Sequence, residues 1–175
     1  MLTLLVVVCT VLAYLLGSIP TAIWYGEAYF GIDVRKHGSG NAGATNTFRV
    51  LGKKAGCFVL FVDAFKGFAA ASLATVLYSF NLVDWQTCVT LKILFGFLAI
   101  IGHLLPVFCD FKGGKGVATT LGMVIALHPQ AACVSSLVFL LVFAISHYVS
   151  LGSMVTSVVF PLLLQFEVFG KELPI

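Results

Sequence analysis

Charged residues are scarce in this sequence. Only 10% of its 175 residues are Asp, Glu, Lys or Arg, whereas 60% are hydrophobic and the mean hydropathy is +1.07. A soluble chain of this length could not hide so much apolar surface from water. The net charge of +3 is small and its cations gather in two short segments, so nucleic acid is not an expected partner. The composition predicts an all-α polytopic membrane protein that forms one domain over residues 1–175.

Metal-ligand spacing and a cleavable leader are also missing. The cysteines show no CxxC pair and lie mostly in apolar runs, which favours small hydrophobic packing residues over zinc ligands or disulfides. We therefore expect neither a metal nor a cofactor. The apolar N-terminal run has no basic start and no A-x-A cleavage site, which favours a retained membrane helix over a signal peptide.

Six apolar segments are long enough, or nearly so, to cross a bilayer, which takes about 20 helical residues. They are residues 2–25, 55–80, 86–108, 117–127, 130–148 and 151–166. The first is expected to kink near Pro20. The fourth is short, so it is either a tilted crossing or a re-entrant piece. The last two are joined by so little chain that they must form an antiparallel pair. The sequence thus predicts six transmembrane helices.

The basic residues between these segments set the expected orientation. Five of them separate the first two segments and two separate the third from the fourth: Arg35, Lys36, Arg49, Lys53, Lys54, Lys112 and Lys115. The opposite loops carry only Lys171. By the positive-inside rule, both basic stretches are expected in the cytoplasm and the N-terminus outside.

The first basic stretch, residues 38–56, reads GSGNAGATNTFRVLGKKAG. Its start matches G-x-G-x-x-G, but a dinucleotide site needs a strand before that motif, and here membrane-helix sequence follows instead. Dense glycines such as Gly40 let successive backbone N–H groups turn toward one point and form an anion site. Short donors and a planar guanidinium accompany them: Ser39, Asn41, Thr45, Asn46 and Arg49. The alternative is an ordinary turn-rich loop with solvated charges.

The second basic stretch, residues 111–120, reads FKGGKGVATT. It is not a Walker A motif, because Cys109 and Gly116 stand where glycine and Ser or Thr are required. Lys115 nevertheless lies between Gly114 and Gly116, directly before a predicted helix whose N-terminus attracts anions. A second phosphate could bind there, with Gly113 in the same turn. The alternative is that the lysines only anchor a helix end at the membrane surface.

Polar residues inside the apolar segments are further candidates. Asp63 and Lys66 lie three apart on one helix face and can neutralise each other; Lys66 is either a site residue or a purely structural partner. His103 lies near the second basic stretch and is a candidate general base, phosphate ligand or packing residue. Ser150, at the turn between the last two segments, could form a third wall of the same site.

Together these stretches resemble the bacterial acyl-phosphate:glycerol-3-phosphate acyltransferases of the PlsY type. The resemblance covers residues 14–20, 38–54, 63–67, 102–119 and 148–153. It implies transfer of a fatty acyl group from acyl phosphate to the 1-hydroxyl of sn-glycerol 3-phosphate, giving lysophosphatidic acid and phosphate. It also implies a multi-pass protein of the bacterial inner membrane, in contact with membrane lipid, without cofactor and without an obligate protein partner.

The resemblance also implies roles for particular residues. In the family a serine and an arginine of the first motif are essential, and these correspond to Ser39 and Arg49, while the glycines of residues 113–116 serve phosphate binding. The resemblance and the residue-level arguments above together give the candidate catalytic set: Ser39, Arg49, Lys115 and His103. The candidate substrate-binding set is Gly40, Asn41, Thr45, Asn46, Gly113, Gly114, Gly116, Lys66 and Ser150. No covalent intermediate is expected, because acyl phosphate is already activated.

One part of the family pattern is missing from this sequence. The family usually has a seventh helix followed by a motif with histidine, asparagine and glutamate, and the sequence ends at Ile175. We therefore expect residues 1–175 alone to hold most phosphate-binding groups but to have little acyltransferase activity. Two other functions stay open: a phosphate or organophosphate transporter, although no internal repeat is visible, and a protein that binds anionic lipid head groups.

Overall fold

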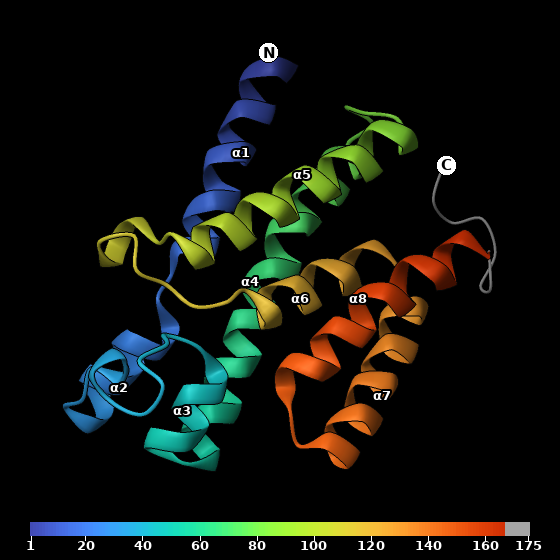
Figure 1. The fold of residues 1–175 in the computed structure, drawn as a ribbon. Coiled ribbons are helices and arrows are strands. Elements are labelled where there is room, and N and C mark those ends of the chain that lie inside the picture. The colour runs from blue at the N-terminus through green and yellow to red at the C-terminus, as the bar shows by residue number, and fades with distance from the viewer. Residues whose placement is uncertain (167–175) are drawn as a thin grey trace.

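The computed structural model describes residues 1–166, and every regular element in that range is helical (Figure 1). The elements in chain order are α1 (Leu2–Ser18), α2 (Thr21–Phe30), η1 (Val34–Lys36), α3 (Ala44–Leu51), α4 (Lys53–Ser79), α5 (Trp85–Leu104), η2 (Val107–Cys109), α6 (Val117–Leu127), α7 (Pro129–Ser146) and α8 (Val149–Gln165). The all-α class predicted from composition is confirmed.

Three helical stretches are long and apolar enough to cross a membrane on their own: α4, α5 continued through η2, and α7. The pair of α1 and α2 passes the same test together, with a bend of 43° between them. Helices α6 and α8 are apolar but shorter. With 11 residues, α6 is about 16 Å long, roughly half of the hydrocarbon thickness. The expected count of six spanning helices is therefore not confirmed.

The first predicted helix is broken rather than kinked. Helix α1 ends at Ser18, and α2 begins at Thr21 and continues to Phe30, beyond the expected end at residue 25. Pro20 lies in the break. Its backbone nitrogen carries no hydrogen and so cannot donate the hydrogen bond that would continue α1. In the break, the carbonyl of Ile19 accepts the amide of Thr21 at 3.0 Å and also a side-chain hydrogen bond from Lys66 at 2.9 Å.

Glycines allow the helices to approach closely at two crossings. Gly17 of α1 lies against the backbone of Ala99 in α5, so a Cβ there would overlap that backbone. Gly67 of α4 lies in the same way against the carbonyl of Thr119 in α6, and Gly122 of α6 faces α4. Small residues at helix crossings are typical of membrane proteins, where close packing replaces the hydrophobic effect. These crossings fix α6 between α4 and the rest of the bundle.

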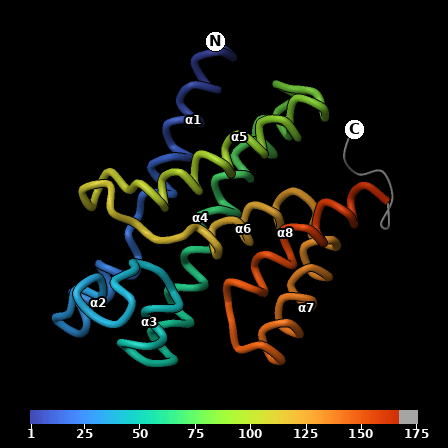
Figure 2. The backbone as a smooth tube through the Cα atoms, viewed as in Figure 1, coloured from blue at the N-terminus to red at the C-terminus, as the bar shows by residue number. Residues whose placement is uncertain are grey.

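Helices α7 and α8 form an antiparallel hairpin at one side of the molecule, as predicted (Figure 2). The chain reverses at His147, which has a left-handed backbone with φ of 58°. At the other end of α7, the ring Nδ1 of His128 accepts a hydrogen bond from the amide of Ala131 at 3.3 Å and so caps the helix.

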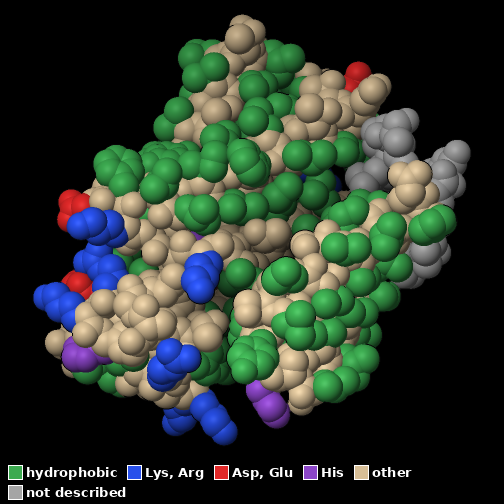
Figure 3. Space-filling view, in the orientation of Figure 1, with side chains coloured by type: hydrophobic (Ala, Val, Ile, Leu, Met, Phe, Trp, Pro, Cys, Tyr) green, Lys and Arg blue, Asp and Glu red, His purple; other side chains and the backbone are tan. Residues whose placement is uncertain are grey.

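Both basic stretches lie at one end of the molecule. Figure 3 shows Lys and Arg side chains gathered over α2, α3 and the turn before α6, whereas hydrophobic side chains cover the opposite end and the α7–α8 hairpin. The first stretch is not a plain loop, because α3 occupies its second half and α4 begins at Lys53. Thr45, Asn46 and Arg49 therefore lie on a helix, not on the expected glycine loop.

Candidate active site between two glycine segments

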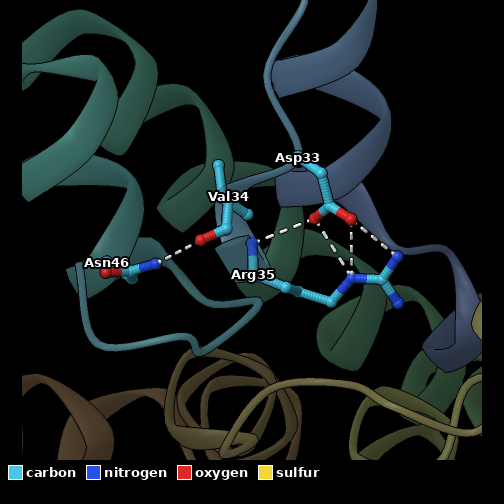
Figure 4. A network of polar contacts seen from close by, with 4 residues as sticks. All are labelled: Asp33, Val34, Arg35 and Asn46. Carbon is cyan, nitrogen blue, oxygen red and sulfur yellow. Dashed lines mark hydrogen bonds and ion pairs between the residues drawn. The ribbon is translucent and has the colours of Figure 1, made fainter. Parts of the chain in front are cut away.

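The first glycine segment, which is the first basic stretch of residues 38–56, is stabilised by hydrogen bonds of the buried Asn46 side chain. This side chain is 1% exposed; its Oδ1 accepts the amide of Ser39 at 2.8 Å, and its Nδ2 donates to the carbonyls of Val34 at 2.8 Å and His37 at 3.1 Å. Figure 4 shows its amide pointing from α3 to Val34. Since both hydrogens of Nδ2 are used, Asn46 fixes the shape of the loop and does not point an open donor outward.

An ion pair ties the start of this segment. The guanidinium of Arg35 donates to both carboxylate oxygens of Asp33 at 3.0 to 3.3 Å, and the amide of Arg35 donates to Oδ1 at 2.9 Å (Figure 4). The side-chain hydrogen bond from Arg35 lowers the pKa of Asp33 and raises the pKa of Arg35. Arg35 is thus engaged within the protein.

The second glycine segment, which is the second basic stretch of residues 111–120, is hydrogen-bonded to the end of α5. The amide of Gly113 donates to the carbonyl of Leu104, and the amide of Gly114 donates to the carbonyl of His103, each at 3.1 Å. A Cβ at either glycine would overlap His103, so only glycine fits this close approach. Both amides are thus used within the protein, and the role of Gly113 and Gly114 in substrate binding stays a prediction.

The next residues have backbone amides that donate no described hydrogen bond, here called open amides. Among the described hydrogen bonds, none is donated by the backbone N–H groups of residues 115–119. Lys115 and Gly116 precede α6, and residues 117–119 are its first residues; Gly116 is in the left-handed conformation with φ of 77°. Lys115 and Val117 are exposed, whereas Gly116 and Thr119 are buried. The anion-attracting donors of this segment thus lie at the start of α6, beside Lys115.

A buried polar cluster lies beneath both segments. Lys66 Nζ is 2.9 Å from Asp63 Oδ1, which confirms the predicted ion pair, and also donates to the carbonyl of Ile19 at 2.9 Å. His103 Nδ1 is 3.7 Å from the same Asp63 oxygen, beyond hydrogen-bonding distance. All three side chains are less than 7% exposed. Neighbouring cationic and anionic groups make this buried charge tolerable.

One small cavity joins these parts. Its volume is about 10 Å³, close to the size of one water-sized group. Residues of the α1–α2 break, the first segment, the buried cluster and the second segment line it: Ile19, Pro20, Thr21, Ala42, Lys66, His103, Pro106, Gly113 and Gly114. The hydroxyl of Thr21 is buried there without a hydrogen-bond partner. The structure therefore brings the two glycine segments together, as the sequence predicted.

A second, larger hollow begins at the same break. It has a volume of about 260 Å³ and is open along one side between α2 and α4. Its walls include the aromatic side chains of Trp24, Tyr25 and Phe58, and it shares Ile19 and Thr21 with the small cavity. The apolar groove and the small cavity thus adjoin at Ile19 and Thr21.

Several predicted site residues lie outside the cavity. Ser39, Arg49 and Lys115 are exposed, and their side chains make no hydrogen bond or ion pair within residues 1–166, so they are open to a ligand. Gly40, with φ of 72°, and the neighbouring Asn41 and Thr45 belong to the same segment as Ser39. Ser150 is exposed on α8, and no described contact joins it to the cavity, so its role stays a prediction.

Two residues of interest were not foreseen. Thr21 follows the Pro20 break and could have been noticed as a polar residue in an apolar run. Lys92 is 8% exposed in the middle of α5, where a lysine within an apolar segment was itself the signal. Among the described residues, no group of three His, Cys, Asp or Glu side chains could hold a metal ion.

Known proteins resemble this chain over nearly its whole length. The family described as "Glycerol-3-phosphate acyltransferase" matches residues 7–174. A protein of that name from Chlorobium limicola is 44% identical over 99% of this chain and 74% of its own length, and one from Enterococcus faecalis is 45% identical over 90% and 69%.

Solved structures agree with this assignment. The crystal structure of PlsY (YgiH), an integral membrane glycerol 3-phosphate acyltransferase, in its glycerol 3-phosphate form is 41% identical, with a TM-score of 0.81 over 95% of this chain and 79% of that one. Its lysophosphatidic acid form gives a TM-score of 0.79 over 94% and 78%. With a bundle of apolar helices and two glycine segments around a polar cavity, this chain belongs to the glycerol-3-phosphate acyltransferase family.

Proposed function

We propose that this protein transfers a fatty acyl group from acyl phosphate to the 1-hydroxyl of sn-glycerol 3-phosphate, forming lysophosphatidic acid and inorganic phosphate. The observation that carries the proposal is that the apolar groove shares Ile19 and Thr21 with the small cavity, which Lys66 and His103 also line. An acyl phosphate has one long apolar part and one anionic part. Its reacting carbonyl joins the two, and so would lie where groove and cavity meet.

The groove is suited to a hydrocarbon chain. Its walls of Trp24, Tyr25 and Phe58 are apolar, and Tyr25 stacks on Phe58 with ring centroids 4.6 Å apart. The open side allows a chain to enter sideways from a lipid layer, where the exposed apolar helices would place it. The apolar part of the donor then stays in its preferred surroundings during the reaction.

Two anionic groups must be bound at once, one on each substrate. We assign them to Arg49 with Ser39 and Gly40 in the first segment, and to Lys115 with the open amides of residues 115–119 in the second. A guanidinium and a helix N-terminus both suit phosphate. Asn41 and Thr45 supply further donors.

The chemistry needs alignment more than activation. The 1-hydroxyl oxygen attacks the acyl carbonyl carbon, the bond from that carbon to the phosphate oxygen breaks, and phosphate leaves with the electron pair. Positioning and charge stabilisation by Arg49 and Lys115 lower the barrier. His103 lines the cavity and is the candidate to receive the hydroxyl proton, while Lys66 holds the α1–α2 break in place.

The proposed location is the bacterial inner membrane, with both glycine segments in the cytoplasm. The gathering of cations at one end supports this orientation (Figure 3). Glycerol 3-phosphate is then taken from the aqueous side, and the acyl chain from the lipid side.

The test is an assay of the purified full-length protein in detergent with labelled glycerol 3-phosphate and one of three donors: palmitoyl phosphate, palmitoyl-CoA or palmitoyl-acyl carrier protein. We expect labelled lysophosphatidic acid, with one phosphate released per product, only with palmitoyl phosphate. Equal transfer from either thioester would overturn the assigned donor. Failure with all three, in a preparation shown to be folded, would overturn the activity.

A further inference from the structure

Lys92 is a buried lysine that the proposed reaction does not use. It lies on α5, seven residues after Trp85, and is 8% exposed. No carboxylate pairs with it among residues 1–166. An ionisable side chain inside a membrane helix is costly and usually has a specific partner.

The partner is the end of α6. Lys92 Nζ donates to the carbonyl of Ala126 at 3.0 Å, one residue before α6 ends at Leu127. The ammonium also lies 5.6 Å from the centre of the Trp85 ring, within the range of a cation–π interaction. The last carbonyls of a helix have no partner within it and carry partial negative charge, so a cation there is favourable.

The other end of α6 is attached to the same helix. The turn before α6 hydrogen-bonds to the last residues of α5 through Gly113 to Leu104 and Gly114 to His103. Between the two ends, Gly96 of α5 faces the side chain of Met123. Helix α5 therefore contacts α6 at its start, its middle and its end.

The part of α5 between these contacts matches α6 in length. From Lys92 to Leu104, α5 rises about 18 Å, and the 11 residues of α6 rise about 16 Å. The contact at Lys92 and the contacts at the second glycine segment thus fix the position of α6 along α5 from both ends. That position decides where the open amides of residues 115–119 lie.

We propose that Lys92 is a positioning residue for the donor phosphate: by binding the end of α6, it fixes the axial position of that helix and of the amides at its start. Helix α6 has only 11 residues and packs closely against α4 at Gly67 and Gly122, so a displacement at its end is passed to its start. The kinetic part of this inference rests on the proposed function.

The test compares Lys92→Met, which removes the charge and the donor but keeps an unbranched side chain, with Lys92→Arg, which keeps both. In Lys92→Met we expect the KM for palmitoyl phosphate to rise about tenfold, as about 1.4 kcal/mol of lost binding gives. The kcat should change by less than about twofold, since the reacting groups are untouched. Lys92→Arg should restore the KM, and Thr90→Val, an exposed change on the same helix, should leave both constants unchanged.

Amide hydrogen exchange supplies a readout that does not depend on activity. In Lys92→Met, we expect faster exchange at Gly113, Gly114 and Thr120, whose amides are hydrogen-bonded at the start of α6, as well as at residues 124–128. Faster exchange confined to residues 124–128, with an unchanged KM, would overturn the proposal and leave Lys92 as a local cap. If Lys92→Met does not fold, Lys92→Gln is measured in the same way. If the wild type does not use acyl phosphate, the proposed donor fails, whereas the exchange result still decides the role of Lys92.

Discussion

Two arginines lie between α2 and α4, and they differ in their partners. Arg35 makes a bidentate ion pair with Asp33, and its side chain is 27% exposed. Arg49 is exposed in the last turn of α3, and its side chain makes no hydrogen bond or ion pair within residues 1–166. Of the two, only Arg49 is free to meet a phosphate.

We expect Arg49→Lys to lose most of the activity. Lysine keeps the positive charge near the C-terminus of α3, so the fold should be retained, but it cannot form two parallel hydrogen bonds to one phosphate. We expect kcat/KM for glycerol 3-phosphate to fall at least about tenfold, equivalent to about 1.4 kcal/mol. Steady-state kinetics measures this, with thermal unfolding in detergent as the check on folding.

The matched comparison for Arg49 is Lys36→Ala, which removes an exposed cation from η1, also between α2 and α4. If kcat/KM falls little in Lys36→Ala and strongly in Arg49→Lys, the loss comes from the hydrogen-bond geometry of Arg49 and not from weaker general attraction of anions. Near-normal kinetics in Arg49→Lys would remove Arg49 from the site.

At the scale of whole helices, apolar runs predicted the long elements well. Residues 117–127 were expected as one short apolar helix, and α6 has these bounds. The break at Pro20 was expected as a kink, because the sequence shows the proline but not the angle. Helix α3 was missed, because its glycine-rich start and polar residues resemble a loop, and its stability depends on the contacts of Asn46 with residues 34–39.

The candidate site was predicted in its parts but not in its connections. Two glycine segments, the Asp63–Lys66 pair and the nearby His103 could all be found in the sequence. The sequence could not show that the amides of Gly113 and Gly114 donate hydrogen bonds to carbonyls of α5, because this depends on where α5 ends in space. Nor could it show the bond from Lys66 to Ile19, since residues 47 apart share no local pattern.

The crossing of α4 and α6 gives a prediction about the elements themselves. In Gly67→Ala, the added Cβ would overlap the backbone carbonyl of Thr119, which cannot move without moving α6. We expect a loss of about 1 to 3 kcal/mol of stability, as for other overpacked sites. A lower unfolding temperature in detergent would show this. Thr75→Ala, exposed on the same helix, is the control and should unfold like the wild type.

Gly67→Ala should also weaken donor binding, because α6 carries the open amides of residues 115–119. A raised KM for palmitoyl phosphate, with less change in the KM for glycerol 3-phosphate, is the expected pattern. An unfolding temperature equal to that of the wild type would mean that the two helices separate easily, and that their crossing does not fix the site.

At the scale of the whole molecule, charge is distributed unevenly between the two ends. The end with α3 and the glycine segments carries the gathered cations (Figure 3), whereas the turn between α4 and α5 carries Asp84 and no lysine. Asp84 caps α5 by accepting the amide of Thr87 at 2.7 Å, so this acidic residue has a structural reason to lie there. This uneven distribution of cations favours a cytoplasmic position for the end that carries α3 and the glycine segments.

Cysteine labelling in intact cells can test this orientation, provided that the labelled sites are accessible. The native Cys88 is fully buried, so it would resist a thiol reagent on either side of the membrane. Exposed positions serve better: Leu82 in the α4–α5 turn and Lys54 at the start of α4. Each is changed to cysteine in a variant whose own five cysteines are replaced.

We expect an impermeant maleimide to modify Leu82→Cys in intact cells and to spare Lys54→Cys until the cells are opened. The physical reason is that translocating the cations of the first basic stretch, Lys53 and Lys54 among them, is disfavoured, whereas the α4–α5 turn has no lysine to retain it. A permeant maleimide should label both variants and so shows that both thiols can react. The reverse pattern in intact cells would place the glycine segments outside, away from cytoplasmic glycerol 3-phosphate, and would contradict the proposed location of the reaction.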